Sequence, residues 1–287
     1  MQSVPLVASF AIGLVMAPAT IRTLREQGHV RENWRGEAVA FPAGIAVPAA
    51  ALVALVPLAL LAELADAGVF TVVDAPIGAF GLGQIALYVL GVAALGLVDD
   101  LAGGAAGGPR GWRGHLRATA EGRLSTGALK AVGTLGLGLF VLSGAGLGAG
   151  EYLLAVALLV LTTNLFNLLD LRPGRSIKGL VLLGAGLTIG TLDADPLWAL
   201  GLFAGPILAL LPHDLRERGM LGDTGSNVVG AVAGLWLLLT LDVTGQAIAL
   251  ALVAVATVYG EFRSISALVE RTPGLRQLDS LGRNEHA

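Results

Sequence analysis

Cysteine is absent from the 287-residue sequence, so disulfides play no part and thiols say nothing about the redox compartment. Charge is scarce as well: charged residues make up 14% of the chain, whereas soluble domains carry about 25%. No polar, linker-like stretch divides the chain. Hydrophobic residues are abundant, 55% of the total, in runs long enough to span a bilayer. We therefore expect a single-domain integral membrane protein with no nucleic-acid partner.

Nine apolar segments approach the roughly 20 residues that a membrane-spanning helix needs. They cover residues 3–21, 38–62, 77–98, 129–149, 152–169, 177–192, 196–212, 225–241 and 245–260. The first lacks the basic start of a cleavable signal, so we expect a spanning helix there. The sixth is short and rich in glycine, which leaves a count of eight or ten open. The prediction is an all-α, polytopic helix bundle over residues 1–260. A tail, 261–287, then lies on the membrane surface or is solvated.

All 18 Lys and Arg residues lie in every second connection between these segments. The basic connections are residues 22–37, 99–128, 170–176, 213–224 and the tail, with Lys130 and Lys178 just inside helix ends. The other connections contain acids and no base. Because cytoplasmic loops are enriched in Lys and Arg, this pattern predicts an N-terminus outside and a C-terminus in the cytoplasm.

A short polar stretch, Gly222-Asp223-Thr224-Gly225-Ser226, opens the eighth apolar segment. Its carboxylate and hydroxyls can cap the helix that follows by accepting from free backbone amides. They can equally hold a metal ion and a phosphate, because glycines let a ligand approach the backbone and helix starts favour anions. Both interpretations stay open for this stretch alone.

Two more apolar segments end in polar side chains on the basic side. The third ends in Asp99 and Asp100, although acids are unfavourable at a helix C-terminus. The pair indicates either an exposed loop start or a site for a divalent cation or a proton. The fifth ends in Asn164, Asn167 and Asp170, whose spacing of three places them on one helix face. Such a stripe either joins helices or lines a polar cavity.

Cations lie near these acids. Arg172, Arg175 and Lys178 follow the stripe, and Lys130 stands just inside the fourth segment. Basic enrichment on the cytoplasmic side accounts for the first three, and Lys130 could extend to the membrane surface. Alternatively, all four bind phosphate. Acids, amides and cations at one membrane depth together predict a Mg²⁺–diphosphate site that faces the cytoplasm.

In their order and helix context these motifs resemble the polyprenyl-phosphate N-acetylhexosamine-1-phosphate transferases. The matching motifs are Leu97-Val98-Asp99-Asp100, Asn164-x-x-Asn167-x-x-Asp170 and Gly222-Asp223-Thr224-Gly225-Ser226. That superfamily includes the bacterial phospho-MurNAc-pentapeptide translocase and the GlcNAc-1-phosphate transferases that start wall and O-antigen polymers. The resemblance covers roughly residues 20–235. It implies a helical bundle in a bacterial-type plasma membrane, with its active site in the cytoplasm.

The resemblance also implies a Mg²⁺-dependent phosphoryl transfer. A polyprenyl phosphate such as undecaprenyl phosphate attacks the β-phosphate of a UDP-amino sugar, a polyprenyl-diphospho-sugar forms, and UMP leaves. Asp99, Asp100 and Asp223 are then catalytic, and Asp223 and Asp170 bind the metal. Substrate contacts are implied for a larger set: Lys130, Asn164, Asn167, Asp170, Arg172, Arg175 and Lys178.

The sequence departs from the family pattern in two places. Asp170 is followed by Leu-Arg-Pro-Gly-Arg where the family has a second acid or amide, and the segment after Tyr259 lacks the translocase's histidine cluster. These departures argue against the translocase itself and leave the sugar and the polymer open. They also leave open a second class, a non-catalytic lipid-phosphate-binding protein or transporter on the same scaffold. Homodimer formation is equally open.

Overall fold

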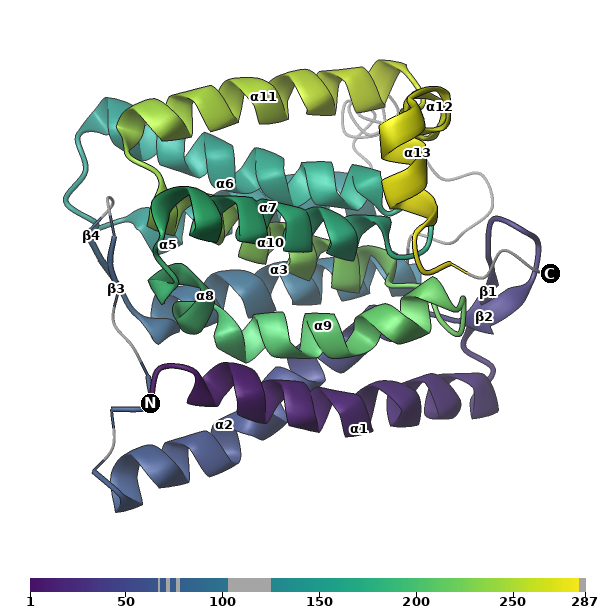
Figure 1. The fold of residues 1–287 in the computed structure, drawn as a ribbon, viewed down its shortest axis with the longest axis horizontal. Helices are drawn as coiled ribbons and strands as arrows, with labels where there is room; N and C mark the ends of the chain where they lie inside the picture. The colour runs from purple at the N-terminus through teal and green to yellow at the C-terminus, as the bar shows by residue number, and fades with distance from the viewer. Residues whose placement is uncertain (67, 71–72, 76–77, 103–124, 284–287) are drawn as a thin grey trace.

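The computed structural model describes residues 1–66, 68–70, 73–75, 78–102 and 125–283. Within these ranges the chain is mostly helical, and the long helices lie side by side in one bundle (Figure 1). The helices are α1 (Val4–Glu26), η1 (Ala43–Ile45), α2 (Ala46–Leu64), α3 (Leu82–Ala102), α5 (Thr126–Leu142), α6 (Ala149–Leu169), α7 (Arg175–Thr191), α8 (Asp195–Ala199), α9 (Gly201–Leu215), α10 (Gly222–Thr240), α11 (Val243–Phe262), α12 (Ile265–Arg271) and α13 (Pro273–Ser280). Two antiparallel hairpins complete the fold, β1 (Val30–Glu32) with β2 (Ala38–Ala40) and β3 (Val73–Ala75) with β4 (Gly78–Phe80).

Five helical segments in the described ranges are long and apolar enough to cross a membrane. They are α1, the 43–64 segment that includes α2, α3, α6 and α11. Large apolar side chains are exposed on their surfaces, among them Val15 of α1, Val56 of α2 and Val255 of α11. Such a surface is unfavourable in water and suited to lipid. The fold is therefore an all-α membrane bundle, as the composition predicts.

Two predicted helix starts are wrong because the apolar residues there form strands. The segment predicted over 38–62 begins with β2, which pairs with β1 so that Val30 faces Ala40. Helix α2 starts only at Ala46, after Pro42, because the backbone before a proline is disfavoured in the helical region. The segment predicted over 77–98 likewise begins in β4, and α3 starts at Leu82.

Two other predicted segments differ in extent. The one predicted over 129–149 ends as α5 at Leu142. Gly144 follows with φ +81°, a conformation that only glycine adopts freely and that a helix cannot continue through. The one predicted over 196–212 is divided at Leu200 into the short α8 and the longer α9, which runs on to Leu215.

Helix α10 is the centre of the bundle. Every residue from Thr224 to Leu239 is buried, and α3, α6 and α7 contact it on different sides. Glycines permit this closeness: Gly230 lies against the backbone of Thr163 in α6. Small residues allow such packing in lipid, where burying apolar surface gives little advantage. Because α10 is enclosed, polar groups at its N-terminus need partners from neighbouring helices.

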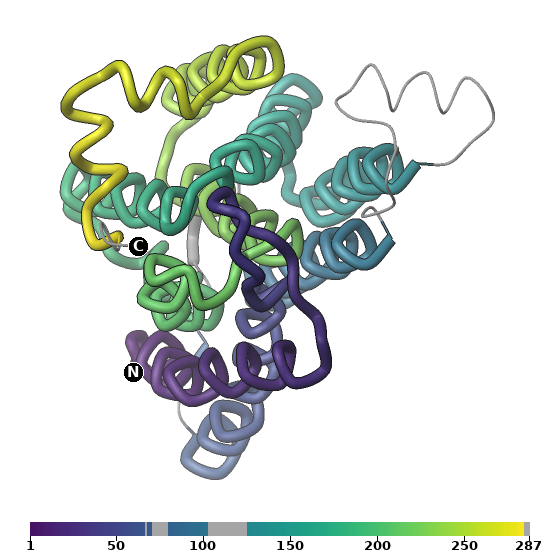
Figure 2. Tube along the Cα trace, turned by 90° about the vertical axis from the view of Figure 1, so that its right-hand side faces the viewer, coloured from purple at the N-terminus to yellow at the C-terminus, as the bar shows by residue number. Residues whose placement is uncertain are grey.

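The polar helix ends gather at one end of the bundle. Helices α3, α6 and α9 end there and α5, α7 and α10 begin there, beside the β1–β2 hairpin and the tail helices α12 and α13 (Figures 1 and 2). The N-terminus and the β3–β4 hairpin lie at the opposite end. The described parts of the basic connections therefore share one end, as the charge alternation predicts. Residues 103–124 of the connection 99–128 lie outside the described residues.

Gly96 provides a test of the packing around α10. A β-carbon at Gly96 would lie 2.6 Å from the Asp223 carbonyl carbon and 2.7 Å from the Thr224 nitrogen. Backbone atoms cannot yield easily, so we expect Gly96→Ala to lower the free energy of unfolding by about 1–3 kcal/mol. Thermal unfolding of the detergent-solubilised protein measures this change.

The matched control is Gly136→Ala in α5, because nothing lies within 4 Å of a β-carbon at that position. Alanine favours helix over glycine by up to about 1 kcal/mol, so this variant should be at least as stable as the parent protein. Equal melting temperatures for the two variants would contradict the close packing of α3 on α10.

Candidate functional site

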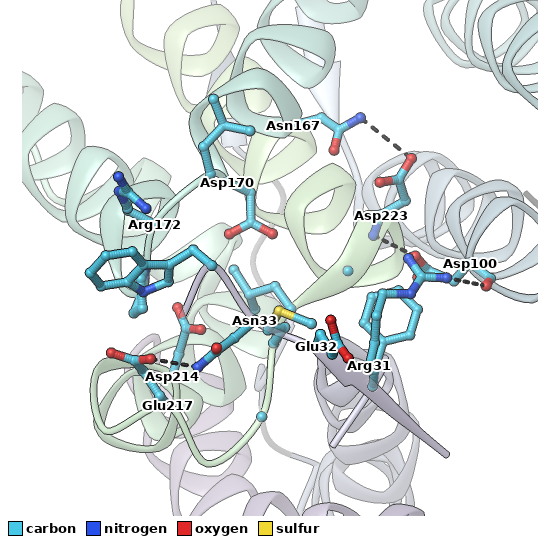
Figure 3. A pocket seen from close by; sticks show the side chains of 18 residues that line it. Arg31, Glu32, Asn33, Asp100, Asn167, Asp170, Arg172, Asp214, Glu217 and Asp223 are labelled. Carbon is cyan, nitrogen blue, oxygen red and sulfur yellow. Dashed lines mark hydrogen bonds between the residues drawn. The ribbon is translucent and has the colours of Figure 1, made fainter. Parts of the chain in front are cut away.

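A cavity of about 350 Å³ lies at the polar end of the bundle (Figure 3). Its walls come from the β1–β2 hairpin, the end of α3, the end of α6 with the loop that follows, and the connection from α9 to α10. The charged residues that line it are Arg31, Glu32, Asp100, Asp170, Arg172, Asp214, Glu217 and Asp223. Six acids and two cations leave an excess of negative charge, which a bound cation would offset.

Asp100 caps the N-terminus of α10 from the neighbouring helix. Its Oδ1 accepts from the Asp223 backbone nitrogen at 2.8 Å, and its Oδ2 accepts from the Thr224 backbone nitrogen at 2.8 Å and from Thr224 Oγ1 at 2.6 Å. These amides are among those that a helix start leaves unpaired. The interpretation in which the 222–226 stretch caps its own helix is therefore wrong. The cap comes from α3, 123 residues earlier in the chain.

Lys130 joins two carboxylates from different helices. Its Nζ lies 3.4 Å from Asp99 Oδ2 and also donates a short hydrogen bond to Asp223 Oδ2. The Asn167 side chain also contacts Asp223, because its amide nitrogen lies 3.4 Å from Asp223 Oδ2. Ser226 Oγ lies 2.9 Å from the same amide group. When the amide is rotated by 180°, so that its oxygen and nitrogen exchange places, the oxygen accepts from Lys130 at 2.8 Å and the nitrogen donates to Ser226 and Asp223. The three predicted motifs and Lys130 therefore meet in one network.

Asp170 lies within range of the charges of three other cavity carboxylates, Asp100, Asp214 and Asp223. Figure 3 shows its side chain directed into the cavity, between Asn167 and Asp214. Among the described residues its carboxylate has no hydrogen-bond partner, whereas the carboxylate of Asp214 accepts from the Gly174 nitrogen at 2.7 Å. Burial, and then the charge of Asp214, raise the pKa of Asp170 well above its ordinary value. A cation in the cavity would reverse this effect by stabilising the ionised form.

The donor chemistry of the cavity fits Mg²⁺ in part. Mg²⁺ prefers carboxylate and phosphate oxygens and keeps several of its ligands from water or substrate. Asp170 and Asp223 offer such oxygens, while both Asp100 oxygens already accept from α10. In the described residues no three His, Cys, Asp or Glu side chains are grouped closely enough to hold a metal ion by themselves. The arrangement thus fits an ion whose remaining ligands come from a bound diphosphate.

The β1–β2 hairpin supplies a wall that the sequence patterns did not identify. Trp34, which is 48% exposed, lies with its ring 4.1 Å from the Arg172 guanidinium. Asn33 donates to Glu217 Oε2 at 2.6 Å, so the hairpin is tied to the α9–α10 connection. Trp34, Asp214 and Glu217 carried no periodic or motif signal that marks them from sequence. Only the apolar run that ends before Asp214 could have drawn attention to it.

Four predicted substrate-binding residues do not line the cavity, and one of them, Lys130, reaches a lining residue through its contact with Asp223. Asn164, one turn before Asn167 on α6, is not among the described residues that line it. Arg175 donates to Asp279 and Lys178 donates to main-chain oxygens of the tail. In this structure these two cations hold the C-terminal segment. Of the cations that follow the stripe, Arg172 alone lines the cavity.

No protein-family model and no curated protein matches this chain. The functional hypothesis therefore rests on the residues around the cavity and on the three motifs.

Asp99 and Asp100 are adjacent acids in different environments, which makes them a matched pair. In Asp100→Asn one accepting oxygen becomes an NH₂ group that faces backbone amides, so we expect a loss of about 1–3 kcal/mol of unfolding free energy. Asp99→Asn leaves Lys130 paired with Asp223, and we expect a loss of at most about 1 kcal/mol. Melting temperatures of the two variants in detergent measure the difference. A larger loss for Asp99→Asn would overturn the capping role.

Proposed function

We propose that this protein is a Mg²⁺-dependent sugar-1-phosphate transferase that acts on a UDP-amino sugar and a polyprenyl phosphate. The observation that carries the proposal is the meeting of three motifs, far apart in the chain, around one cavity. Asp100 comes from α3, Asn167 and Asp170 from the end of α6, and Asp223 from the start of α10. Asp99, the neighbour of Asp100, does not line the cavity and is joined to Asp223 through Lys130. A cavity of this volume is within the usual range for small-molecule sites.

The proposed reaction forms a bond between a lipid-phosphate oxygen and the β-phosphorus of the nucleotide, and UMP leaves with the electrons of the broken P–O bond. Phosphoryl transfer of this kind depends on positioning and on neutralising charge, so no protein nucleophile is required. Arg31 and Arg172 line the cavity and would bind phosphate oxygens. Asp170 and Asp223 would hold Mg²⁺, which neutralises charge on the diphosphate when bound.

The residues around Lys130 have separate tasks in this proposal. Lys130 pairs with both Asp99 and Asp223, so its positive charge offsets the repulsion between the two carboxylates and orients them. Asp99, with a side chain 20% exposed, is available to orient the lipid phosphate. Asp100 acts through the backbone of α10, because its oxygens are engaged there, and it is therefore a positioning residue for Asp223.

The proposal includes an orientation in a bacterial-type plasma membrane. We propose nine spans, with the N-terminus outside and the cavity facing the cytoplasm. Two observations support it: the basic connections share one end of the bundle in its described part, and every Lys and Arg belongs to that set. UDP-sugars are cytoplasmic substrates, so this orientation places the cavity where such a donor is available.

The activity is tested with radiolabelled UDP-GlcNAc, undecaprenyl phosphate, Mg²⁺ and the purified full chain in detergent. We expect label to move into the lipid extract, to stop on chelation with EDTA and to resume when Mg²⁺ is restored. Asp223→Asn removes a charged group that acts on the transferring phosphoryl group, so we expect a loss of at least about 100-fold in kcat. Scintillation counting of the lipid phase and HPLC detection of UMP measure the two products.

The control for this assay is Glu261→Gln, an exposed carboxylate of α11 outside the cavity, which should transfer sugar at the parent rate. No transfer from any donor in a panel of UDP-sugars, by protein that unfolds cooperatively, would contradict the proposal. Saturable binding of undecaprenyl phosphate under those conditions would then favour the non-catalytic lipid-phosphate binder.

The proposed orientation is tested with single cysteines, because the chain contains none of its own. Asp193→Cys lies between α7 and α8, and Glu261→Cys lies near the end of α11. In right-side-out bacterial spheroplasts, a membrane-impermeant maleimide should label Asp193→Cys directly and Glu261→Cys only after permeabilisation. The reverse order would invert the topology and place the cavity outside.

A further inference from the structure

The C-terminal tail is docked on the start of α7 through one carboxylate. Asp279 of α13 accepts from Arg175 at 2.8 and 3.0 Å, and from Arg283 at 2.8 and 2.9 Å. Both pairs are bidentate, the geometry that gives arginine–carboxylate pairs their strength and direction. The side chains of Arg175, Asp279 and Arg283 are 7%, 11% and 11% exposed, so solvent screens these pairs less than it would at an open surface.

Further contacts connect the same tail to the same helix start. Lys178 donates to the main-chain oxygens of Leu278, Asp279 and Leu281, which stabilises the C-terminal end of α13. Arg175 also donates to Ser266 in α12 at 2.9 Å. Both tail helices are therefore fastened to the first turn of α7.

The loop between α6 and α7 lies between this tail and the cavity. Arg283 Nε donates to the Pro173 carbonyl at 2.8 Å, and Pro173 lines the cavity together with Asp170 and Arg172. From the other side, the Gly174 nitrogen donates to Asp214. The loop that presents two charged groups to the cavity is thus held by α9 on one side and by the tail on the other.

We propose that Asp279 is a positioning residue for the cavity: by binding Arg175 and Arg283 it docks the tail on the 170–174 loop and thereby sets the cavity's affinity for a diphosphate. The identity of the ligand rests on the proposed function, but the coupling between tail and loop does not. Asp279 touches no residue of the cavity itself, so its effect passes through Arg283 and Pro173 and through the first turn of α7.

The charges around Asp279 indicate what its removal does. Arg175, Lys178 and Arg283 all lie around it, so an uncharged side chain would leave three cations together without their carboxylate. Although burial acts in the opposite direction, hydrogen bonds from Arg175 and Arg283 lower the pKa of Asp279 below its ordinary value. The carboxylate is therefore ionised at neutral pH, and its neutral amide analogue should release the tail.

The first test measures hydrogen exchange of the full chain in detergent without ligand. In Asp279→Asn we expect amides of the tail, 265–283, and of the 170–174 loop to exchange at least about tenfold faster, because local opening becomes more frequent. Asp279→Glu keeps a carboxylate between the arginines and should restore most of the protection. Glu261→Gln, which removes the same charge from an exposed site, should leave both segments unchanged.

The second test measures calorimetric binding of inorganic diphosphate with Mg²⁺, so it needs no sugar transfer. We expect affinity about tenfold weaker in Asp279→Asn and near the parent value in Asp279→Glu. If the protein transfers sugar, KM for the UDP-sugar should rise by a similar factor while kcat changes by less than about twofold, since only ligand binding is weakened.

Different outcomes separate this proposal from the proposed function. Faster tail exchange with an unchanged 170–174 loop, or with unchanged diphosphate affinity, would overturn the positioning role. Absence of sugar transfer by the parent protein would contradict the transferase while the exchange and calorimetric results still decide the role of Asp279. If Asp279→Asn does not fold, Arg283→Met removes the donor to Pro173 and is expected to give the same exchange pattern.

Discussion

The N-terminus of α10 is held by the carboxylate of Asp100, and the position of the whole cavity depends on this contact. Helix α10 is enclosed by other helices from Thr224 onward, so the backbone amides at its start depend on acceptors within the bundle. Asp100 supplies both oxygens from α3. Gly96, one turn earlier on α3, lets the two backbones approach closely enough for these bonds to form. Asp223 is thereby presented toward Lys130 and Asn167.

The charges of the cavity follow from the same arrangement. The ends of α3, α6, α9 and α10 meet the β1–β2 hairpin at one end of the bundle, and together they place six acids and two arginines around one cavity. Some acids have internal partners: Asp100 has the start of α10, Asp214 has Gly174, and Asp223 has Lys130. Asp170 has none among the described residues and is directed into the space. A half-buried carboxylate without a hydrogen-bond partner is unfavourable, which makes a cationic or metal-bearing ligand a natural complement.

The tail and the hairpin bind cations that are close together in the sequence but lie apart in the folded chain. Arg175 and Lys178 stand beside Arg172 in the sequence and look like one phosphate-binding group. In the folded chain these cations lie apart. Helix α7 begins at Arg175 and places Arg175 and Lys178 next to Asp279, while Arg172 remains in the loop before the helix. Trp34 meets Arg172 only because the hairpin folds over the same end of the bundle. Cations that are neighbours in the sequence therefore contact different parts of the protein, Arg172 the cavity and the other two the tail.

Composition and periodicity were sufficient to predict the class of fold and to locate the polar motifs at the helix ends. Long apolar runs can satisfy their backbone groups in lipid only as helices, so the helical bundle followed directly from the sequence. The grouping of the basic connections followed from charge alone. The strands at 38–40 and 78–80 were missed because their residues are as apolar as the helices that follow them, and only their pairing partners distinguish them.

The tertiary structure decided which polar groups face one another. A repeat of three places Asn164, Asn167 and Asp170 on one helix face, but it cannot say how far along that face the cavity reaches. Nor could the sequence assign the cap of α10, because the 222–226 stretch contains Asp, Thr and Ser, which can themselves cap a helix, while the acceptor that does so lies on another helix. Helix formation is governed by local backbone and side-chain preferences. Which polar groups bond to one another depends on which helix ends the packing brings within hydrogen-bond distance. The local sequence does not determine that distance.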